Sequence, residues 1–311
     1  MAEITKRNVP WLVQIWHFVL HLRLHYQFFI LSGAFLMGGL LSDDFDTNWF
    51  IVQFLNIHLL LFGGATAYNS FWDRDEGPIG GLKNPPKMHP WMWLASLFLQ
   101  MIGLLVALPM GTFFVALYAL SMLFFWLYSS PWTRWKGRPF KSLIAIGFST
   151  GFNTVLMGYI AAGHEPLGFF IWIVAAGVTL ILLSLYPVSQ LYQQEEDQKR
   201  GDRTFAITYG KTIVLYFFGM AFFSGVLLTT LGICLQHLKL GLLFGITGSV
   251  VGMVINNRLK ALIKRSQSDY QSVMYMKYGT SLAFVSFLIV TLMLKHSGSI
   301  FFSSIAEWLL G

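Results

Sequence analysis

The feature that most constrains this chain is a succession of nine apolar segments, each close to the length that crosses a lipid bilayer. A transmembrane helix needs roughly 20 mainly apolar residues. Backbone polar groups in hydrocarbon must be paired within the chain, and the alternating pattern of a membrane barrel is absent, so helices are predicted. The predicted spans are residues 26–41, 49–68, 91–108, 112–128, 142–162, 167–190, 213–236, 240–255 and 278–294.

Composition supports a membrane protein with a single domain. Hydrophobic residues make up 55% of the chain and charged residues only 11%, with a mean hydropathy of +0.60. The single cysteine, Cys234, excludes an intramolecular disulfide. We therefore expect an all-α integral membrane domain over residues 1–311. It would comprise an N-terminal amphipathic segment (1–25), a nine-helix bundle (26–295) and a C-terminal tail (296–311).

The stretch 11–24 mixes polar and apolar residues and is typical of an amphipathic helix lying in the membrane interface. His17, His21 and His25 recur on it at four-residue intervals. In a helix they would spread over about 12 Å, with no acidic or cysteine partner near. We therefore interpret them as packing or interfacial residues and do not predict a metal or haem site.

The distribution of Lys and Arg predicts the topology, because cytoplasmic loops of membrane proteins carry an excess of both. With the N-terminus inside and nine spans, only Lys239 and Lys295 of the 21 basic residues fall outside. We therefore predict a multi-pass protein of a prokaryotic cell membrane, with the N-terminus and site loops cytoplasmic and the C-terminus outside. The inside groups are Lys6, Arg7 and Arg23; Arg74, Lys83 and Lys87; Arg134, Lys136, Arg138 and Lys141; Lys199, Arg200, Arg203 and Lys211; and Arg258, Lys260, Lys264, Arg265 and Lys277.

The net charge of +7 indicates the kind of partner. The basic residues are scattered over short loops between apolar segments, which does not suit nucleic acid. Anionic membrane lipids and an anionic substrate are the expected partners.

Two polar helix ends on the predicted inner side carry amide and carboxylate side chains. If the second span continues past residue 68, Asn69, Asp73 and Glu76 fall on one helix face. After the sixth span, Gln193 and Asp197 are four residues apart, with Glu196 beside Asp197. Mg²⁺ prefers oxygen ligands and commonly bridges one or two carboxylates to substrate phosphates. We predict a magnesium diphosphate site in which Asp73 and Asp197 are the principal, catalytic ligands and the other four residues are secondary ligands.

Three stretches together resemble the signatures of the UbiA superfamily of intramembrane prenyltransferases. Asn69 and Asp73 match the first signature, Asn-Asp-x-x-Asp-x-x-x-Asp. The segment 128–136 is similar to a Tyr-Ser-x-Pro-Pro-Leu-Arg-Leu-Lys segment after span four. The second signature, Asp-x-x-x-Asp with a Gly-x-Arg-Thr tail, is matched by Asp197, Gly201, Arg203 and Thr204.

Three carboxylates of these signatures are replaced in this chain. Ser70 and Gly77 stand where the first signature has its second and last acids, and Gln193 stands for the first acid of the second signature. Asp75, Glu76, Glu195 and Glu196 lie near enough to be considered as substitutes, and Glu76 and Glu196 fit the helical faces best.

The resemblance implies Mg²⁺-dependent ionisation of a prenyl diphosphate and transfer of the isoprenoid group to a lipophilic acceptor of aromatic, quinone or pigment type. A terpene cyclase of the same superfamily and a non-catalytic lipid-binding or transport protein are alternatives. Asn153 could reach the substrate or make an interhelical hydrogen bond. The predicted substrate-binding residues are Lys83, Lys87, Tyr128, Arg134, Lys136, Asn153, Tyr192 and Arg203.

Overall fold

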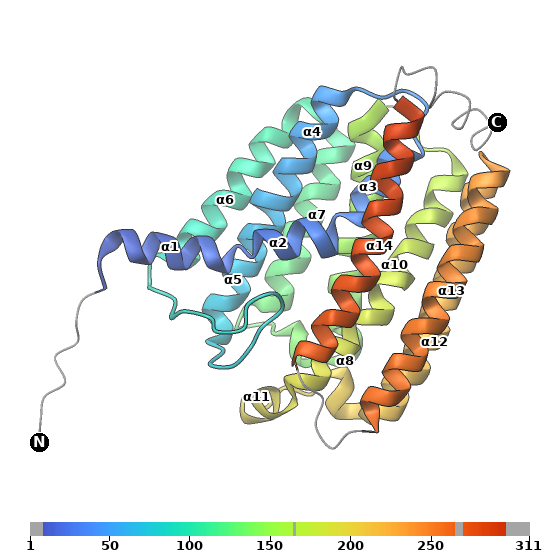
Figure 1. Cartoon of the computed structure of the whole chain (residues 1–311). Coiled ribbons are helices and arrows are strands. Elements are labelled where there is room, and N and C mark those ends of the chain that lie inside the picture. Colours follow the sequence, from blue (N-terminus) through green and yellow to red (C-terminus); the bar gives the residue numbers. More distant parts are fainter. Residues whose placement is uncertain (1–8, 164–165, 265–269, 297–311) are drawn as a thin grey trace, which may run out of the picture.

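The computed structural model describes residues 9–163, 166–264 and 270–296, and these residues form a bundle of long helices (Figure 1). The start of the predicted N-terminal segment with Lys6 and Arg7, Arg265 and the tail 297–311 lie outside this range. Six of the long helices are α6 (Met92–Ala107), α7 (Thr112–Ser129), α10 (Phe169–Ser189), α12 (Phe205–Cys234), α13 (Leu238–Ile263) and α14 (Tyr270–His296).

Two further long helices are each built from three pieces around a π-helical turn. One comprises α4 (Thr47–Leu55), η2 (Asn56–Phe62) and α5 (Gly63–Asp73). The other comprises α8 (Pro139–Ile146), η5 (Gly147–Phe152) and α9 (Asn153–Gly163). Within the described residues, eight helices are thus long and apolar enough to cross a membrane.

The predicted first span is shorter and broken in the structure. It consists of α2 (Leu24–Tyr26), the π-helix η1 (Gln27–Leu31) and α3 (Gly33–Leu40), and all eight residues of α3 are buried. Its main neighbours are α9 and α14. This segment is not among the eight described helices that are long and apolar enough to cross a membrane. A ninth crossing and the orientation of the bundle therefore stay predictions.

The predicted amphipathic segment forms α1 (Trp11–His21), which lies across the direction of the long helices (Figure 1). This helix exposes Trp11, Leu12 and Trp16, of which Leu12 is 78% accessible. Large apolar side chains on an outer surface suit contact with lipid. The helix ends because Arg23 adopts a left-handed backbone conformation, with φ 50° and ψ 46°.

The docking of α1 is expected to weaken in acid because of His21. Its buried Nε2 donates a hydrogen bond to the carbonyl of Pro86, 2.8 Å away, and burial lowers the pKa of the imidazole from 6.5 to about 4. The docked state therefore favours neutral His21, so stability is full above pH 6.5 and falls as the pH drops toward 4. We expect a loss of about 2 kcal/mol between pH 7 and pH 5.

Thermal stability of the protein in lipid nanodiscs at the two pH values measures this loss. His21→Gln keeps an N–H donor but does not titrate, so its stability should change less over the same interval. An equal loss in the variant would contradict the assignment to His21.

Glycine residues let neighbouring helices approach closely in the bundle core. An added Cβ at Gly38 of α3 would overlap the backbone oxygen of Val155 in α9, and one at Gly158 of α9 would overlap the backbone oxygen of Phe35. Small residues at such crossings give the close backbone packing that stabilises helix association in lipid. These two glycines therefore allow α3 and α9 to cross with their backbones in close contact.

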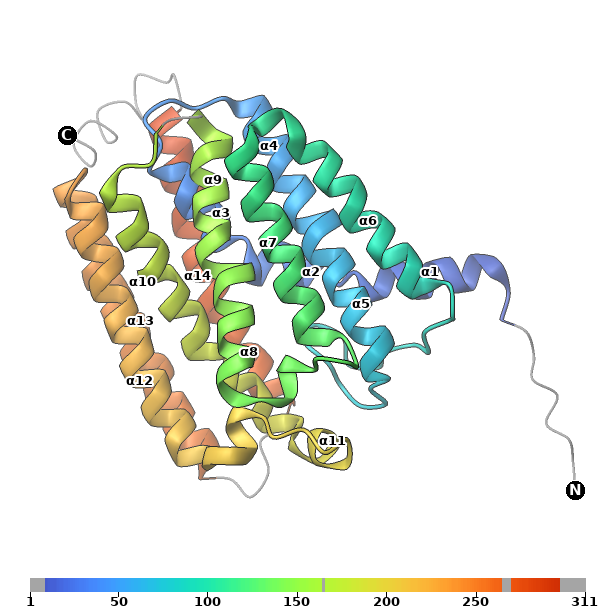
Figure 2. The same cartoon turned by 180° about the vertical axis from the view of Figure 1, so that it is seen from behind.

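One end of the bundle gathers the polar elements. The loop after α5, the short helix η4 (Trp135–Gly137), η6 (Gln190–Tyr192) with α11 (Gln194–Lys199), and the start of α14 meet there (Figures 1 and 2). Segments far apart in the chain therefore surround one polar region at a single end of the apolar bundle.

Candidate active site

A cavity of about 510 Å³ opens between α5, α10, α11, α13 and α14. Its polar end carries charged side chains from the loops, and its interior is walled by apolar side chains. The charged lining residues are Arg23, Asp73, Asp75, Lys136, Asp197, Arg200 and Lys277. Asp73 and Asp197, which lie 124 positions apart by their numbers in the sequence, thus line the same cavity.

Helix α5, which carries the first polar motif, ends at Asp73, before it reaches Glu76. Asn69 and Asp73 both line the cavity from α5, but Arg74 adopts a left-handed conformation (φ 53°, ψ 39°) and ends the helix. Glu76 therefore does not continue that face, and its side chain is exposed outside the cavity. The predicted alignment of Glu76 with Asn69 and Asp73 is wrong, and its proposed ligand role loses its basis.

The second polar helix end keeps its predicted spacing. Gln193 caps α11, where its carbonyl accepts a hydrogen bond from the Asp197 N–H at 2.9 Å, and both side chains line the cavity. Glu196 points elsewhere, because its Oε1 accepts a 2.6 Å hydrogen bond from the Gly77 N–H. Glu196 is outside the cavity lining and joins the α5 loop to α11.

Two cations from the loop after α7 surround Asp73. Lys136 Nζ forms an ion pair with Asp73 Oδ2, and both side chains are buried. Arg134 Nη1 lies 3.8 Å from Asp73 Oδ1, while its Nε and Nη2 donate to Asp202 at 2.7 and 2.8 Å. Asp202 therefore holds Arg134 beside Asp73. Of these two cations, Lys136 lines the cavity and Arg134 does not.

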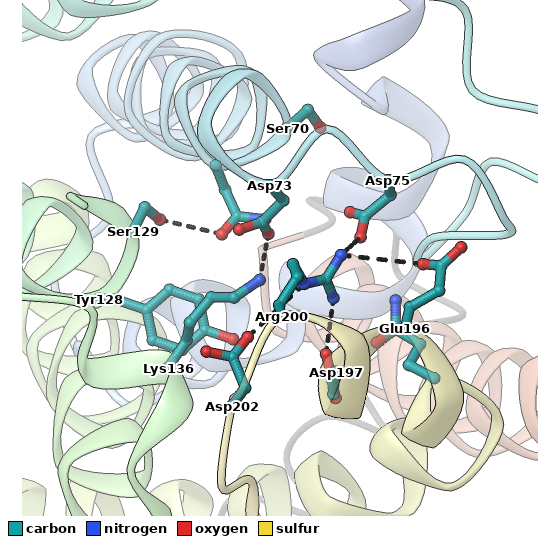
Figure 3. Close-up of polar contacts among 12 residues, drawn as sticks. Ser70, Asp73, Asp75, Tyr128, Ser129, Lys136, Glu196, Asp197, Arg200 and Asp202 are labelled. Atoms are coloured by element: carbon teal, nitrogen blue, oxygen red, sulfur yellow. Dashed lines mark hydrogen bonds and ion pairs between the residues drawn. The ribbon is translucent and has the colours of Figure 1, made fainter.

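Arg200 joins the two polar helix ends (Figure 3). Its Nη1 pairs with Asp75 from the α5 loop, and its Nη2 donates to Asp197 Oδ1 at 2.7 Å. Its Nε lies 3.6 Å from Asp202 Oδ2. One guanidinium thus contacts carboxylates from both predicted motifs, which is consistent with the two segments forming one site.

Burial controls the ionisation of these loop groups. It raises the pKa of the Asp197 carboxyl, an effect that Lys136 and Arg200 oppose. It also raises the pKa of Glu196, which the Gly77 N–H opposes. Burial lowers the pKa of Arg200, but Asp75 and the neighbouring carboxylates hold it above its ordinary value. Burial disfavours an isolated charge, and the two cations beside Asp197 favour the ionised form of its carboxyl group.

The oxygen atoms at the polar end fit a magnesium ion that is completed by substrate. Among the described residues, no cluster of three or more His, Cys, Asp or Glu side chains forms a ready-made metal site. Asp73 Oδ1, however, is buried without a hydrogen-bond partner. Carboxylate oxygens of Asp73 and Asp197 with the amides of Asn69 and Gln193 match the few protein ligands that Mg²⁺ takes when phosphates and water supply the rest.

Several predicted substrate-binding residues lie outside the cavity. Lys83, Lys87 and Arg203 are exposed on loops and do not line it. Asn153 is buried in the bundle, where its Nδ2 donates to Ser121 Oγ at 3.0 Å, so it makes the interhelical hydrogen bond that was one of its two predicted roles. Tyr128 lines the cavity. So does Tyr192.

The structure adds Arg23, Lys277 and Arg200 to the cavity lining, together with Asp75. Arg200 could have been found from its spacing, because it follows Asp197 by three residues and Glu196 by four on one helix. The sequence pattern around Arg23 and Lys277 does not point to a site, since each is a single basic residue beside an apolar segment.

The model of the UbiA prenyltransferase family matches residues 28–288. The chain belongs to this family. It is therefore a multi-pass integral membrane protein of a family that transfers prenyl groups. A comparison with curated proteins found no match.

Solved structures share the fold at low sequence identity. A UbiA homolog from Archaeoglobus fulgidus bound to GPP and Mg²⁺ is 15% identical, with a TM-score of 0.69 over 88% of this chain and 98% of that chain. The same homolog bound to DMAPP and Mg²⁺ gives 15% identity and a TM-score of 0.68, with the same coverage. A digeranylgeranylglyceryl phosphate synthase structure is 18% identical, with a TM-score of 0.61 over 89% of this chain and 99% of that chain.

Ser70 and Gly77, which replace two aspartates of the first UbiA signature, each contact another residue near the site. Ser70 Oγ accepts a 2.6 Å hydrogen bond from Arg23 Nη2. A Cβ at position 77 would lie 2.5 Å from Glu196 Oε1. Gly77 therefore leaves room for the Glu196 carboxylate to approach the backbone where the signature has an aspartate.

Proposed function

We propose that this UbiA-family prenyltransferase transfers an isoprenoid group from a prenyl diphosphate to a lipophilic acceptor with the help of Mg²⁺. The observation that carries the proposal is the shared cavity, in which Asp73 and Asp197 face the same polar end as Lys136 and Arg200. The same cavity continues into an apolar interior. A ligand with a charged head and an apolar tail matches both parts.

The polar end would bind the diphosphate. Asp73 and Asp197, with Asn69 and Gln193, would hold Mg²⁺, which when bound neutralises diphosphate oxygens and makes the group easier to expel. Lys136 and Arg200 would donate hydrogen bonds to the remaining oxygens, with charge-assisted strength. When the carbon–oxygen bond breaks, its electron pair leaves with the diphosphate, and these cations stabilise the added charge.

The apolar part of the cavity would hold the prenyl chain and exclude water from the allylic cation. Tyr128 and Tyr186 both line the cavity, with their hydroxyl oxygens 3.0 Å apart. Their rings offer aromatic faces that stabilise positive charge. The acceptor would then attack the cation and release a proton. The apolar walls include Ile30, Leu31, Phe125, Val178, Leu185, Phe222, Val226, Phe244, Phe284 and Phe287.

Diphosphate release from purified protein in lipid nanodiscs tests the proposal. Prenyl diphosphates of several lengths are supplied with Mg²⁺ or with EDTA, with and without aromatic or quinone-type acceptors. We expect acceptor-dependent release and a prenylated product, reduced by at least about a hundredfold in EDTA, because a metal supplies several kcal/mol of charge stabilisation.

Other outcomes separate the alternatives. Release without acceptor, with a cyclic hydrocarbon or alcohol as product, would identify a terpene cyclase. Lipid binding without release for any chain length would identify a non-catalytic binding or transport protein. Either result would refute the transferase assignment.

A further inference from the structure

The residues that line the cavity carry more positive than negative charge. Four of them are cations and three are carboxylates, so the balance is +1. Ion pairs with Lys136 and Arg200 engage all three carboxylates. Arg23 and Lys277 are the two lining cations that form no ion pair with the described residues. The charged residues are Arg23, Lys136, Arg200 and Lys277, with Asp73, Asp75 and Asp197.

Arg23 places a buried guanidinium group at the polar end without a carboxylate beside it. The residue lies at the break between α1 and α2 and is only 7% exposed. Its Nη2 donates to Ser70 Oγ at 2.6 Å, and its Nη1 donates to the carbonyl of Gly80 at 3.4 Å. Its Nε is buried and has no hydrogen-bond partner among the described residues. A buried cation without an opposite charge is costly, and a bound anion would offset that cost.

The serine at position 70 explains why Arg23 lacks a carboxylate partner. The first UbiA signature has an aspartate at this position, and the short contact between Ser70 and Arg23 means that a carboxylate here would pair with the guanidinium group. Gln193, which lines the cavity, likewise puts a neutral amide where the second signature has an acid. Acids at these two positions would change the balance from +1 to −1.

Lys277 adds a second unpaired cation next to Arg23. It lies on α14, is 7% exposed, and donates from Nζ to the Tyr26 hydroxyl at 2.6 Å. Tyr26 follows Arg23 by three residues, and its N–H donates to the Arg23 carbonyl at 2.8 Å. Arg23 also interacts electrostatically with Asp75. The corner between α2 and the start of α14 is therefore a cationic part of the polar end.

We propose that Arg23 is a fixed cation for the diphosphate and that the polar end binds the diphosphate without metal. Surplus positive charge in a buried site attracts an anion directly, whereas surplus carboxylates would repel it until a metal neutralised them. Mg²⁺ is then needed to expel the diphosphate and not to bind it. This inference rests on the proposed function, because it assigns a residue and a binding order within the same site.

Calorimetric titration of inorganic pyrophosphate into the full chain in zwitterionic nanodiscs tests metal-free binding. Titrations are made in EDTA and in Mg²⁺, with empty nanodiscs as background. We expect the affinity of the wild type in EDTA to lie within about tenfold of its affinity in Mg²⁺. Arg23→Gln should weaken binding in EDTA by about tenfold or more, because it removes a hydrogen bond to a charged group, and Arg23→Lys should lose less.

Ser70→Asp and Ser70→Asn form a matched pair that keeps Arg23 in place. The two new side chains have nearly the same volume, but only the aspartate adds a charge that pairs with the guanidinium group. Ser70→Asp should therefore bind pyrophosphate in EDTA about tenfold or more weakly than Ser70→Asn. Equal affinities of these two variants in EDTA would overturn the inference, and so would a wild type that binds pyrophosphate only with Mg²⁺. This pair decides the matter even if Arg23→Gln does not fold.

The two proposals fail separately in these experiments. Metal-free binding that depends on Arg23, without diphosphate release from any prenyl diphosphate, would remove the transferase assignment and leave an anion-binding site. Diphosphate release by a protein that binds pyrophosphate only with Mg²⁺ would leave the transferase and remove the role of Arg23.

Discussion

Asp197→Asn is expected to lower diphosphate release by about a thousandfold or more, and Asp73→Asn should have a comparable effect. Each substitution keeps the side-chain volume but removes one of the two carboxylate charges that face the polar end from opposite motifs. The loss of charge stabilisation at a departing diphosphate corresponds to about 4 kcal/mol of the activation barrier. The rate of diphosphate release at saturating Mg²⁺ and substrate measures it.

Glu76→Gln supplies the matched control for these substitutions. Glu76 lies three residues after Asp73, in the loop that follows α5, and its side chain is exposed outside the cavity. The release rate of this variant should equal that of the wild type. Retained activity in folded Asp197→Asn, or a loss in Glu76→Gln as large as in Asp73→Asn, would refute the assignment of the metal-binding carboxylates.

Gly158→Val, a substitution away from the cavity, is expected to lower the stability of the protein strongly. The first side-chain carbon at this position would overlap the backbone oxygen of Phe35, and a backbone carbonyl cannot turn aside as a flexible side chain can. Helices α3 and α9 would have to separate, and α3 is buried along its whole length. We expect a loss of about 3 kcal/mol or more, because overpacking against backbone exceeds ordinary core strain.

Unfolding of the purified protein in detergent by heat measures the effect of Gly158→Val. Gly219→Val is the control, since an added Cβ at this helical position meets no atom within 4 Å. It reports the cost of a β-branched residue in a helix without the clash. Equal stability of the two variants would contradict the prediction that a side chain at position 158 cannot be accommodated where α3 and α9 cross.

The spans and the family were accessible from the sequence because both depend on local patterns. A run of apolar residues is long enough to cross a membrane whatever its neighbours are, and all the predicted spans from residue 49 onward correspond to long helices. The spacing of Asn69 and Asp73, and of Gln193 and Asp197, survived because each pair lies within one or two helical turns. The family match over residues 28–288 agrees with the resemblance found from these motifs.

The predictions that were wrong failed because the backbone departs locally from a regular α-helix. A left-handed Arg74 ends α5 at Asp73, so Glu76 leaves the face on which helical periodicity had placed it. The first segment is divided by a π-helical turn, so α3 is a short helix enclosed by its neighbours. Neither backbone change has a strong signature, because both Arg and the apolar residues involved are ordinary members of regular helices.

By itself, the sequence determined that this chain is helical, lies in a membrane and carries two polar motifs, because hydrophobic length and helical spacing act over neighbouring residues. Only the tertiary structure decided which charges share the cavity. Arg200 joins Asp75 to Asp197, and Lys277 meets Tyr26 from 251 residues further along the chain. Such pairings depend on how the helices cross. In a buried site of low polarity, the position of each charge relative to its partners determines whether it binds a carboxylate of the protein or an anion from outside.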